Sequence, residues 1–137
     1  MADGVFLDTV GLLAVSNRDD ELHGVAAGVL RQLEESGRPV VTTTFVLAEV
    51  GNGLARTVLR TDAGWPIRKL HSDPRSTVVY VDRNGLFKAV ELYAGRSDKS
   101  WGLVDCVSFV VMRGMRLTEA FTADHHFEQA GFVALLK

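Results

Sequence analysis

Four acidic residues carry the chemistry that this sequence most clearly suggests: Asp8, Glu49, Asp105 and Asp124. Asp8 and Asp105 lie in the most apolar segments of the chain, and charged side chains are seldom buried unless they are paired or bind a metal. Clustered carboxylates repel one another unless cations intervene, and hard ions such as Mg²⁺ or Mn²⁺ prefer oxygen ligands. Two such ions roughly 4 Å apart could flank a phosphodiester, one activating water and the other stabilising the leaving oxygen.

Each acid also has a simpler interpretation. An aspartate directly after a strand is often a helix N-cap, which would account for Asp8 or Asp124, and Glu49 alone would be a solvated helix residue. Asp105 is harder to explain in this way, because it lies in the almost entirely apolar run VDCVSFVVM. A metal site therefore requires that the fold bring all four acids together.

The elements that must position these acids alternate between strand and helix. Short apolar or β-branched runs predict strands, and periodic apolar spacing predicts helices. We expect strands at 5–8, 39–43, 77–81, 120–122 and 132–136, the last at an edge of the sheet. We expect helices at 9–15, about 45–60 and 101–115, one after Asp82, and a short one between Pro66 and Pro74.

A further amphipathic helix is predicted between the first two strands. Asp19 and Asp20 are its candidate N-caps, and Gly37 ends it. Its apolar face comprises Leu22, Val25, Ala26, Val29, Leu30 and Leu33. Thr44 or a neighbour is expected to cap the helix over about 45–60.

Strand–helix alternation predicts an α/β fold with a mostly parallel central sheet and helices on both faces. The 137 residues fit a single domain, 1–137. In such sheets ligands bind beyond the carboxyl ends of the strands. Because the four acids follow strands or begin helices there, we expect them to meet at this edge.

Net charge, cysteine content and the length of apolar segments limit the classes of protein to which this chain can belong. The net charge of −2 argues against a protein that holds nucleic acid by bulk positive charge, but it does not exclude a nuclease whose metal supplies that charge. The single cysteine, Cys106, cannot form an internal disulfide and favours a reducing compartment. The N-terminus lacks the basic region of a signal peptide, and no segment is long and apolar enough for a membrane span. We expect a soluble cytoplasmic protein.

Four segments of the sequence resemble the PIN-domain family, and within it the VapC-type toxin ribonucleases. They are VFLDT (5–9), FVLAEVGNGLAR (45–56), DKSWGLVDCVSFVVM (98–112) and AFTADHHF (120–127), and the last two are the more specific. The resemblance implies a three-layer PIN-like fold and a metal-dependent endoribonuclease that uses Mg²⁺ or Mn²⁺. It also implies an RNA substrate, a VapB-like antitoxin as partner, and a homodimer.

By position, the four acids resemble the family's metal-binding and catalytic residues. Thr122 resembles the hydroxyl residue that orients the site, and Asp98 falls where many relatives carry a supporting acid at the rim. The chain departs from the family at Gly102, where relatives commonly have a serine. Ser100 is the candidate to replace that serine as helix cap.

Other polar residues receive simpler interpretations. His125 and His126 do not predict a zinc site, because adjacent histidines point in different directions and no partner pair has ligand spacing. Trp101 is expected to pack at the entrance of its helix rather than to stack on a base. Four basic residues are expected to be surface charges rather than phosphate contacts: Arg56, Arg60, Lys99 and Arg113.

Three alternatives remain open. VFLDT also resembles the start of haloacid-dehalogenase-like phosphatases, but Val10 stands where those enzymes have a second aspartate. A receiver domain is also α/β, but the pair Asp19 and Asp20 does not directly follow a strand. A PIN fold that binds RNA or protein without cutting is the more serious alternative, and the presence of all four acids argues against it.

Overall fold

The five strands form one parallel sheet in the order β3-β2-β1-β4-β5, and the computed structural model describes residues 3–137. Every neighbouring pair of strands is parallel. The strands are β1 (Val5–Leu7), β2 (Val40–Thr43), β3 (Ser76–Val79), β4 (Glu119–Phe121) and β5 (Val133–Ala134). The predicted parallel sheet is confirmed, with the last strand at an edge.

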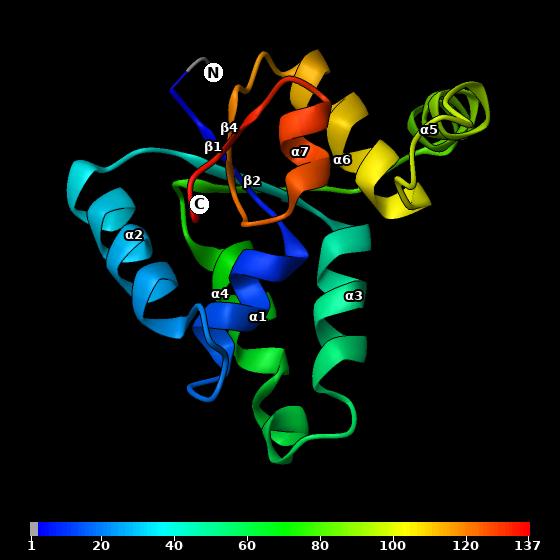
Figure 1. Cartoon of the computed structure of the whole chain (residues 1–137). Coiled ribbons are helices and arrows are strands. Elements are labelled where there is room, and N and C mark those ends of the chain that lie inside the picture. Colours follow the sequence, from blue (N-terminus) through cyan, green and yellow to red (C-terminus); the bar gives the residue numbers. More distant parts are fainter. Residues whose placement is uncertain (1–2) are drawn as a thin grey trace.

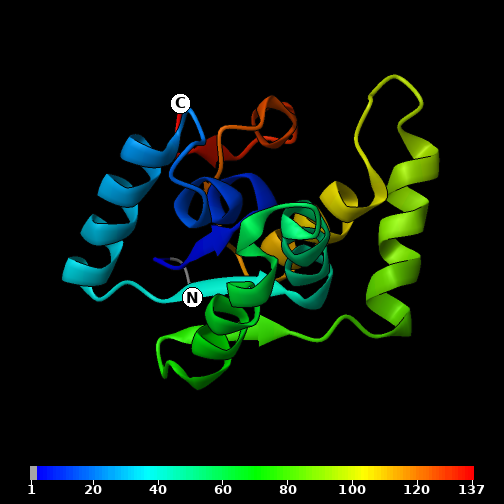
Figure 2. The same cartoon turned by 90° about the horizontal axis from the view of Figure 1, so that it is seen from below.

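Helices connect the strands and cover both faces of the sheet (Figures 1 and 2). They are α1 (Thr9–Ser16), α2 (His23–Ser36), α3 (Thr44–Leu54), α4 (Gly64–Ser72), α5 (Arg83–Gly95), α6 (Leu103–Gly114) and α7 (His125–Gln129). A 3₁₀ helix (Val58–Asp62) lies between α3 and α4. Figure 1 shows α2 and α5 on opposite sides of the molecule.

Alternation along β1 divides the core into two parts, because successive side chains of a strand point to opposite faces. Val5 and Leu7 pack in a cluster with residues of α1 and α2, whereas Phe6 packs in a cluster with residues of α3, α5, α6 and α7. In the second cluster the ring of Phe109 contacts those of Trp101 and Phe127 edge-on, at centroid distances of 5.1 and 5.0 Å. The predicted three-layer α/β fold is confirmed.

Several predicted helix ends are also confirmed. The Thr43 hydroxyl accepts a hydrogen bond from the Val46 amide and caps α3, and Asp82 caps α5 by accepting from the Gly85 amide at 2.9 Å. Gly37 ends α2 with a φ of 69°, a left-handed conformation that glycine adopts without the usual penalty.

The helix predicted over about 45–60 is shorter than expected, since α3 ends at Leu54. Gly51 and Gly53 lower the helix propensity of its last turn. Thr57 then begins a separate 3₁₀ helix, because its hydroxyl accepts a hydrogen bond from the Leu59 amide.

The predicted start of α2 is also wrong. The Asp20 carboxylate accepts a hydrogen bond from the Leu22 amide and closes a turn, so that α2 begins only at His23. Ala26 and Leu33 face the core, but Val25 is 53% exposed because it lies at the margin of the buried face. Within residues 3–137, no helix is long and apolar enough to cross a membrane.

Candidate functional site

The four predicted acids line one cavity of about 370 Å³ at the carboxyl edge of the sheet. Asp8 and Asp124 come from neighbouring strands, because Leu7 and Phe121 are partners in the β1–β4 ladder. Glu49 reaches the cavity from α3 and Asp105 from the first turn of α6. Sequence positions 8, 49, 105 and 124 thus meet in space, as the parallel sheet predicted. The remaining lining residues are Thr9, Val10 and Asn52.

Asp8 is the most buried of the four acids, with 4% of its surface exposed. Burial raises the pKa of its carboxyl group to about 6, although the hydrogen bond from Thr122 lowers that pKa in part. The nearby charge of Asp105 also raises it. At neutral pH an ionised Asp8 is therefore held at a cost in free energy that a bound cation would offset.

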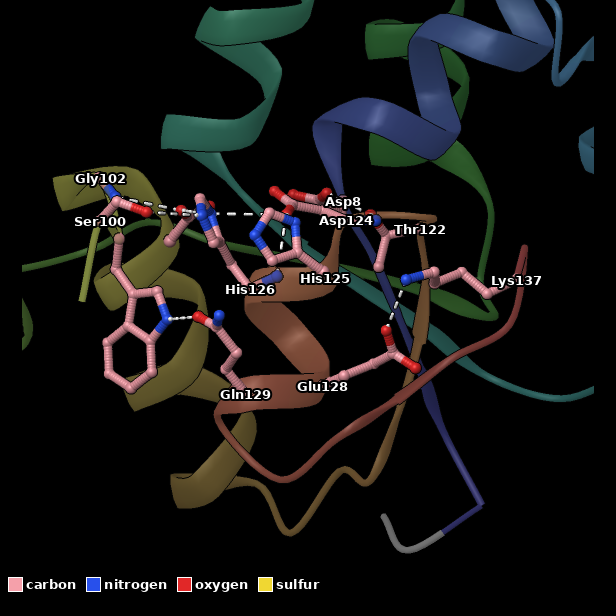
Figure 3. A network of polar contacts seen from close by, with 12 residues as sticks. Asp8, Ser100, Gly102, Thr122, Asp124, His125, His126, Glu128, Gln129 and Lys137 are labelled. Carbon is pink, nitrogen blue, oxygen red and sulfur yellow. Dashed lines mark hydrogen bonds and ion pairs between the residues drawn. The ribbon is translucent and has the colours of Figure 1, made fainter. Parts of the chain in front are cut away.

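Thr122 connects two of the acids. Its hydroxyl donates a 2.7 Å hydrogen bond to Oδ2 of Asp8 and accepts one of 3.1 Å from the Asp124 amide (Figure 3). Since Thr122 is fully buried, its side chain has little freedom to turn away. Thr122 therefore fixes the orientation of the Asp8 carboxylate relative to the backbone of Asp124.

Glu49 is oriented from α1. The Thr9 hydroxyl donates a 2.7 Å hydrogen bond to its Oε1, across the cavity mouth from α1 to α3. Asn52 lies one helical turn after Glu49 and also lines the cavity. Sequence reasoning missed Asn52, although its i+3 spacing from Glu49 was a signal that could have identified it.

Asp105 caps its own helix. Its Oδ2 accepts a 3.1 Å hydrogen bond from the Gly102 amide. Burial raises the pKa of Asp105, the Gly102 hydrogen bond opposes this, and the charge of Asp124 raises it further. The prediction that Ser100 caps this helix is wrong, because Gly102 occupies the N-cap position and the Ser100 hydroxyl instead lies 3.2 Å from Nε2 of His126.

His126 belongs to the acidic cluster, which the sequence analysis did not predict. Its Nδ1 lies 3.0 Å from Oδ2 of Asp105 and 3.4 Å from Oδ1 of Asp124. Its amide donates a 2.9 Å hydrogen bond to Oδ1 of Asp124, so that Asp124 caps α7 (Figure 3). The prediction that the two histidines point in different directions is wrong, because Nδ1 of His125 also lies near Oδ1 of Asp124, at 3.7 Å, and the centroids of the two rings are 4.4 Å apart. They differ in burial, since the side chain of His125 is 61% exposed and that of His126 only 18%.

Asp98 does not line this cavity. Its side chain is 61% exposed and pairs with Arg96 at 3.0 Å. Trp101 is 5% exposed, and its indole Nε1 donates to Oε1 of Gln129, so that it packs within the protein and offers no face to a base. None of the four basic residues considered above is among the residues that line the cavity.

The donor set of the cavity fits a divalent cation. Four carboxylates surround one small space, and two of them have pKa values raised by burial. Hard divalent ions prefer such oxygen-rich surroundings. The N-termini of α1 and α6 also point their partial positive charge toward these carboxylates.

Comparison with known sequences identifies the family. The sequence profile of the PIN domain matches residues 5–133. The chain belongs to the PIN-domain family. It is 32% identical over 134 residues to the 23S rRNA-specific endonuclease VapC20 of Mycobacterium tuberculosis, covering 94% of this chain and 95% of the relative. The predicted family is confirmed, and the relative is named as an endonuclease.

Solved structures agree with this family. The crystal structure of VapC20 from M. tuberculosis, described as a sarcin-ricin loop cleaving toxin, is 28% identical and superposes with a TM-score of 0.81, over 94% of this PIN-domain chain and 96% of that one. VapBC2 from Rickettsia felis, bound to a promoter DNA fragment, is 15% identical, with a TM-score of 0.68 over 96% of each chain. FitAcB from Neisseria gonorrhoeae is 19% identical, with a TM-score of 0.64 over 95% of this chain and 94% of that one. The last two structures show that this chain shares their fold.

Proposed function

We propose that this PIN-domain protein is a divalent-metal-dependent endoribonuclease and the toxin of a VapBC-type pair. The observation that carries this proposal is the convergence of Asp8, Glu49, Asp105 and Asp124 on one cavity at the carboxyl edge of the sheet. Bound Mg²⁺ or Mn²⁺ would supply the positive charge that neutralises the phosphodiester and makes water nucleophilic near neutral pH.

In this proposal the four acids hold the metal and the remaining residues position them. Thr122 holds the carboxylate of Asp8, and Thr9 holds that of Glu49. Because each carboxylate is restrained by a neighbour before metal binds, little conformational freedom is lost on binding. Asn52 offers an amide group at the cavity wall, where the substrate backbone would pass. Asp98 remains a candidate only for a supporting role at the rim.

An antitoxin partner is supported by an apolar groove away from the acids. The groove lies between α1, α2 and α4 and is lined mainly by apolar side chains, including Leu12, Val15, Leu30 and Trp65. Trp65 is 65% exposed in the isolated chain, and large apolar surfaces of this kind commonly mark protein interfaces. We propose that a VapB-like antitoxin covers this groove.

The homodimer is proposed on the outer face of α5. Phe87, Val90 and Tyr93 are 58%, 41% and 52% exposed there, at a spacing that places them on one side of the helix. We further propose a cytoplasmic location, where an RNA substrate is present and the single cysteine would remain reduced.

The proposed activity is tested by RNA cleavage with the purified chain. Ribosomal RNA is the first substrate to examine, since VapC20 is named for that RNA. Cleavage is expected with Mg²⁺ or Mn²⁺ and is expected to stop in EDTA. An intact RNA pool after incubation with folded protein and either ion would contradict the proposal and favour a non-catalytic binding module.

A further inference from the structure

A histidine projects into the acidic cluster from α7. Two carboxylate oxygens lie close to Nδ1 of His126, Oδ2 of Asp105 at 3.0 Å and Oδ1 of Asp124 at 3.4 Å. Asp124 and His126, together with His125, place their ligand atoms within 4.8 Å of one another, close enough to hold one metal ion. The His126 side chain is 18% exposed, so the contact is partly buried.

The two distances suit ligands of one ion. Donor atoms about 2.1 Å from a shared cation lie about 3.0 Å apart at adjacent corners of an octahedron and about 3.4 Å apart in a tetrahedron. An imidazole nitrogen placed at these separations from two carboxylate oxygens needs little movement to share their ion. A hydrogen bond would also account for the 3.0 Å contact. The surroundings of the second ring nitrogen, Nε2, therefore bear on whether Nδ1 can bind metal.

Ser100 lies beside this second ring nitrogen of His126. Its hydroxyl lies 3.2 Å from Nε2 of His126, on the opposite side of the ring from the acids. A histidine that binds metal usually donates its other N–H to a nearby acceptor, which fixes the tautomer. A hydroxyl both donates and accepts, so Ser100 suits either tautomer of His126. The Nδ1–H tautomer would donate to Asp105, whereas the Nε2–H tautomer would donate to Ser100 and leave the Nδ1 lone pair facing the acids.

We propose that His126 is a nitrogen ligand of the divalent ion shared by Asp105 and Asp124, so that this site prefers transition-metal ions to Mg²⁺. The inference rests on the metal site of the proposed function. Imidazole binds Co²⁺, Zn²⁺ and similar ions well, whereas Mg²⁺ takes oxygen ligands and keeps its water. Removal of the imidazole therefore weakens transition-metal binding and leaves Mg²⁺ binding largely unchanged.

His126→Asn separates ligation from hydrogen bonding. The asparagine amide occupies about the place of Nδ1 and still donates a hydrogen bond to Asp105, but it has no lone pair on nitrogen to bind an ion. His125→Asn tests the rival histidine, because Nδ1 of His125 lies 3.7 Å from the same Asp124 carboxylate but its side chain is 61% exposed. Circular dichroism and melting curves establish that each variant is folded.

Two measurements test the proposal. Pulsed electron paramagnetic resonance of the Mn²⁺-loaded parent is expected to show coupling to a ¹⁴N nucleus, retained in His125→Asn and lost in His126→Asn. Calorimetric titration is expected to show a Co²⁺ affinity lowered at least tenfold in His126→Asn, with the Mg²⁺ affinity changed less than about threefold.

Each contrary result has a distinct meaning. Metal binding without nitrogen coupling, or equal losses of Co²⁺ and Mg²⁺ affinity in His126→Asn, would overturn the role of His126 as a ligand while leaving the proposed nuclease intact. Loss of the coupling in His125→Asn, with the coupling retained in His126→Asn, would overturn the choice of histidine. No binding of any of these ions by the parent would overturn both this inference and the metal-dependent function.

Discussion

Replacing Asp8 by asparagine is expected to stabilise the metal-free protein at neutral pH. Burial raises the pKa of Asp8 from 3.8 to about 6 in the folded chain. Each pKa unit corresponds to about 1.4 kcal/mol, so holding the ionised carboxylate costs about 3 kcal/mol relative to the unfolded chain. The asparagine side chain carries no charge, and its carbonyl can still accept the hydrogen bond from Thr122.

The pH dependence follows from the direction of this shift. Because the folded protein binds the Asp8 proton more tightly than the unfolded chain, the stabilising contribution is complete below about pH 4 and is lost as pH rises through about 6. The advantage of Asp8→Asn should therefore be largest at pH 7.5 and nearly absent at pH 4. For a domain of this size about 3 kcal/mol corresponds to a rise in melting temperature of about 10 °C.

The assay is thermal unfolding followed by circular dichroism in EDTA at both pH values. Asp62→Asn is the matched control, because Asp62 is exposed, lies outside the acidic cavity and changes the net charge equally. Its melting temperature should remain close to that of the parent. A melting temperature for Asp8→Asn at or below the parent's at pH 7.5 would refute the reasoning.

Metal is expected to reverse the order of stability of the two proteins. If Mg²⁺ binds the folded parent and not the unfolded chain, it should raise the parent's melting temperature with concentration, as ligand linkage requires. Asp8→Asn should lose most of that rise, because one carboxylate no longer faces the cavity. An equal response to Mg²⁺ in both proteins would show that Asp8 does not contribute to the metal site.

Three other substitutions test separate parts of the structure. Asp105→Asn should retain the circular dichroism spectrum and melt no lower than the parent, since burial raises the pKa of Asp105 as well, but it should lower RNA cleavage by about two orders of magnitude. Near-parental cleavage would argue that Asp105 only caps its helix. Gly11→Ala should cost about 3 kcal/mol in urea unfolding, because the added Cβ would overlap the main-chain oxygen and the ring of Phe121. Thr122→Val should raise the pKa of Asp8 further and weaken Mg²⁺ binding about tenfold in a calorimetric titration, and unchanged affinity would exclude its positioning role.

The sequence predicted the parts of this fold that depend on local pattern and on topology. Parallel strands bring their carboxyl ends to one edge, so the meeting of Asp8 and Asp124 followed from strand assignment alone. The strongly apolar surroundings of Asp105 marked it as unusual before its neighbours were known. Thr43 and Asp82 cap the first turns of α3 and α5, and Gly37 ends α2, as their residue types indicate.

The helix end and the side-chain contact that the sequence did not predict depend on which of several alternative hydrogen bonds forms. Thr57 begins a separate turn because α3, whose last turn contains Gly51 and Gly53, ends at Leu54. Ser100 was expected to cap a helix, yet its hydroxyl faces His126, and that contact depends on the direction in which α7 leaves β4. Sequence spacing contains no information on that angle, which is why His126 was assigned to no site.

The β1–β4 ladder has a consequence for the nascent protein. Leu7 pairs with Phe121, and Thr122 binds Asp8, so a residue is held by another that is synthesised 114 positions later. Domains fold from the N-terminus during synthesis, but this contact must wait until β4 has left the ribosome. A chain released before residue 124 lacks Asp124, and with it the residue that caps α7. A ribosome that stalls or releases this chain early should therefore produce no active nuclease.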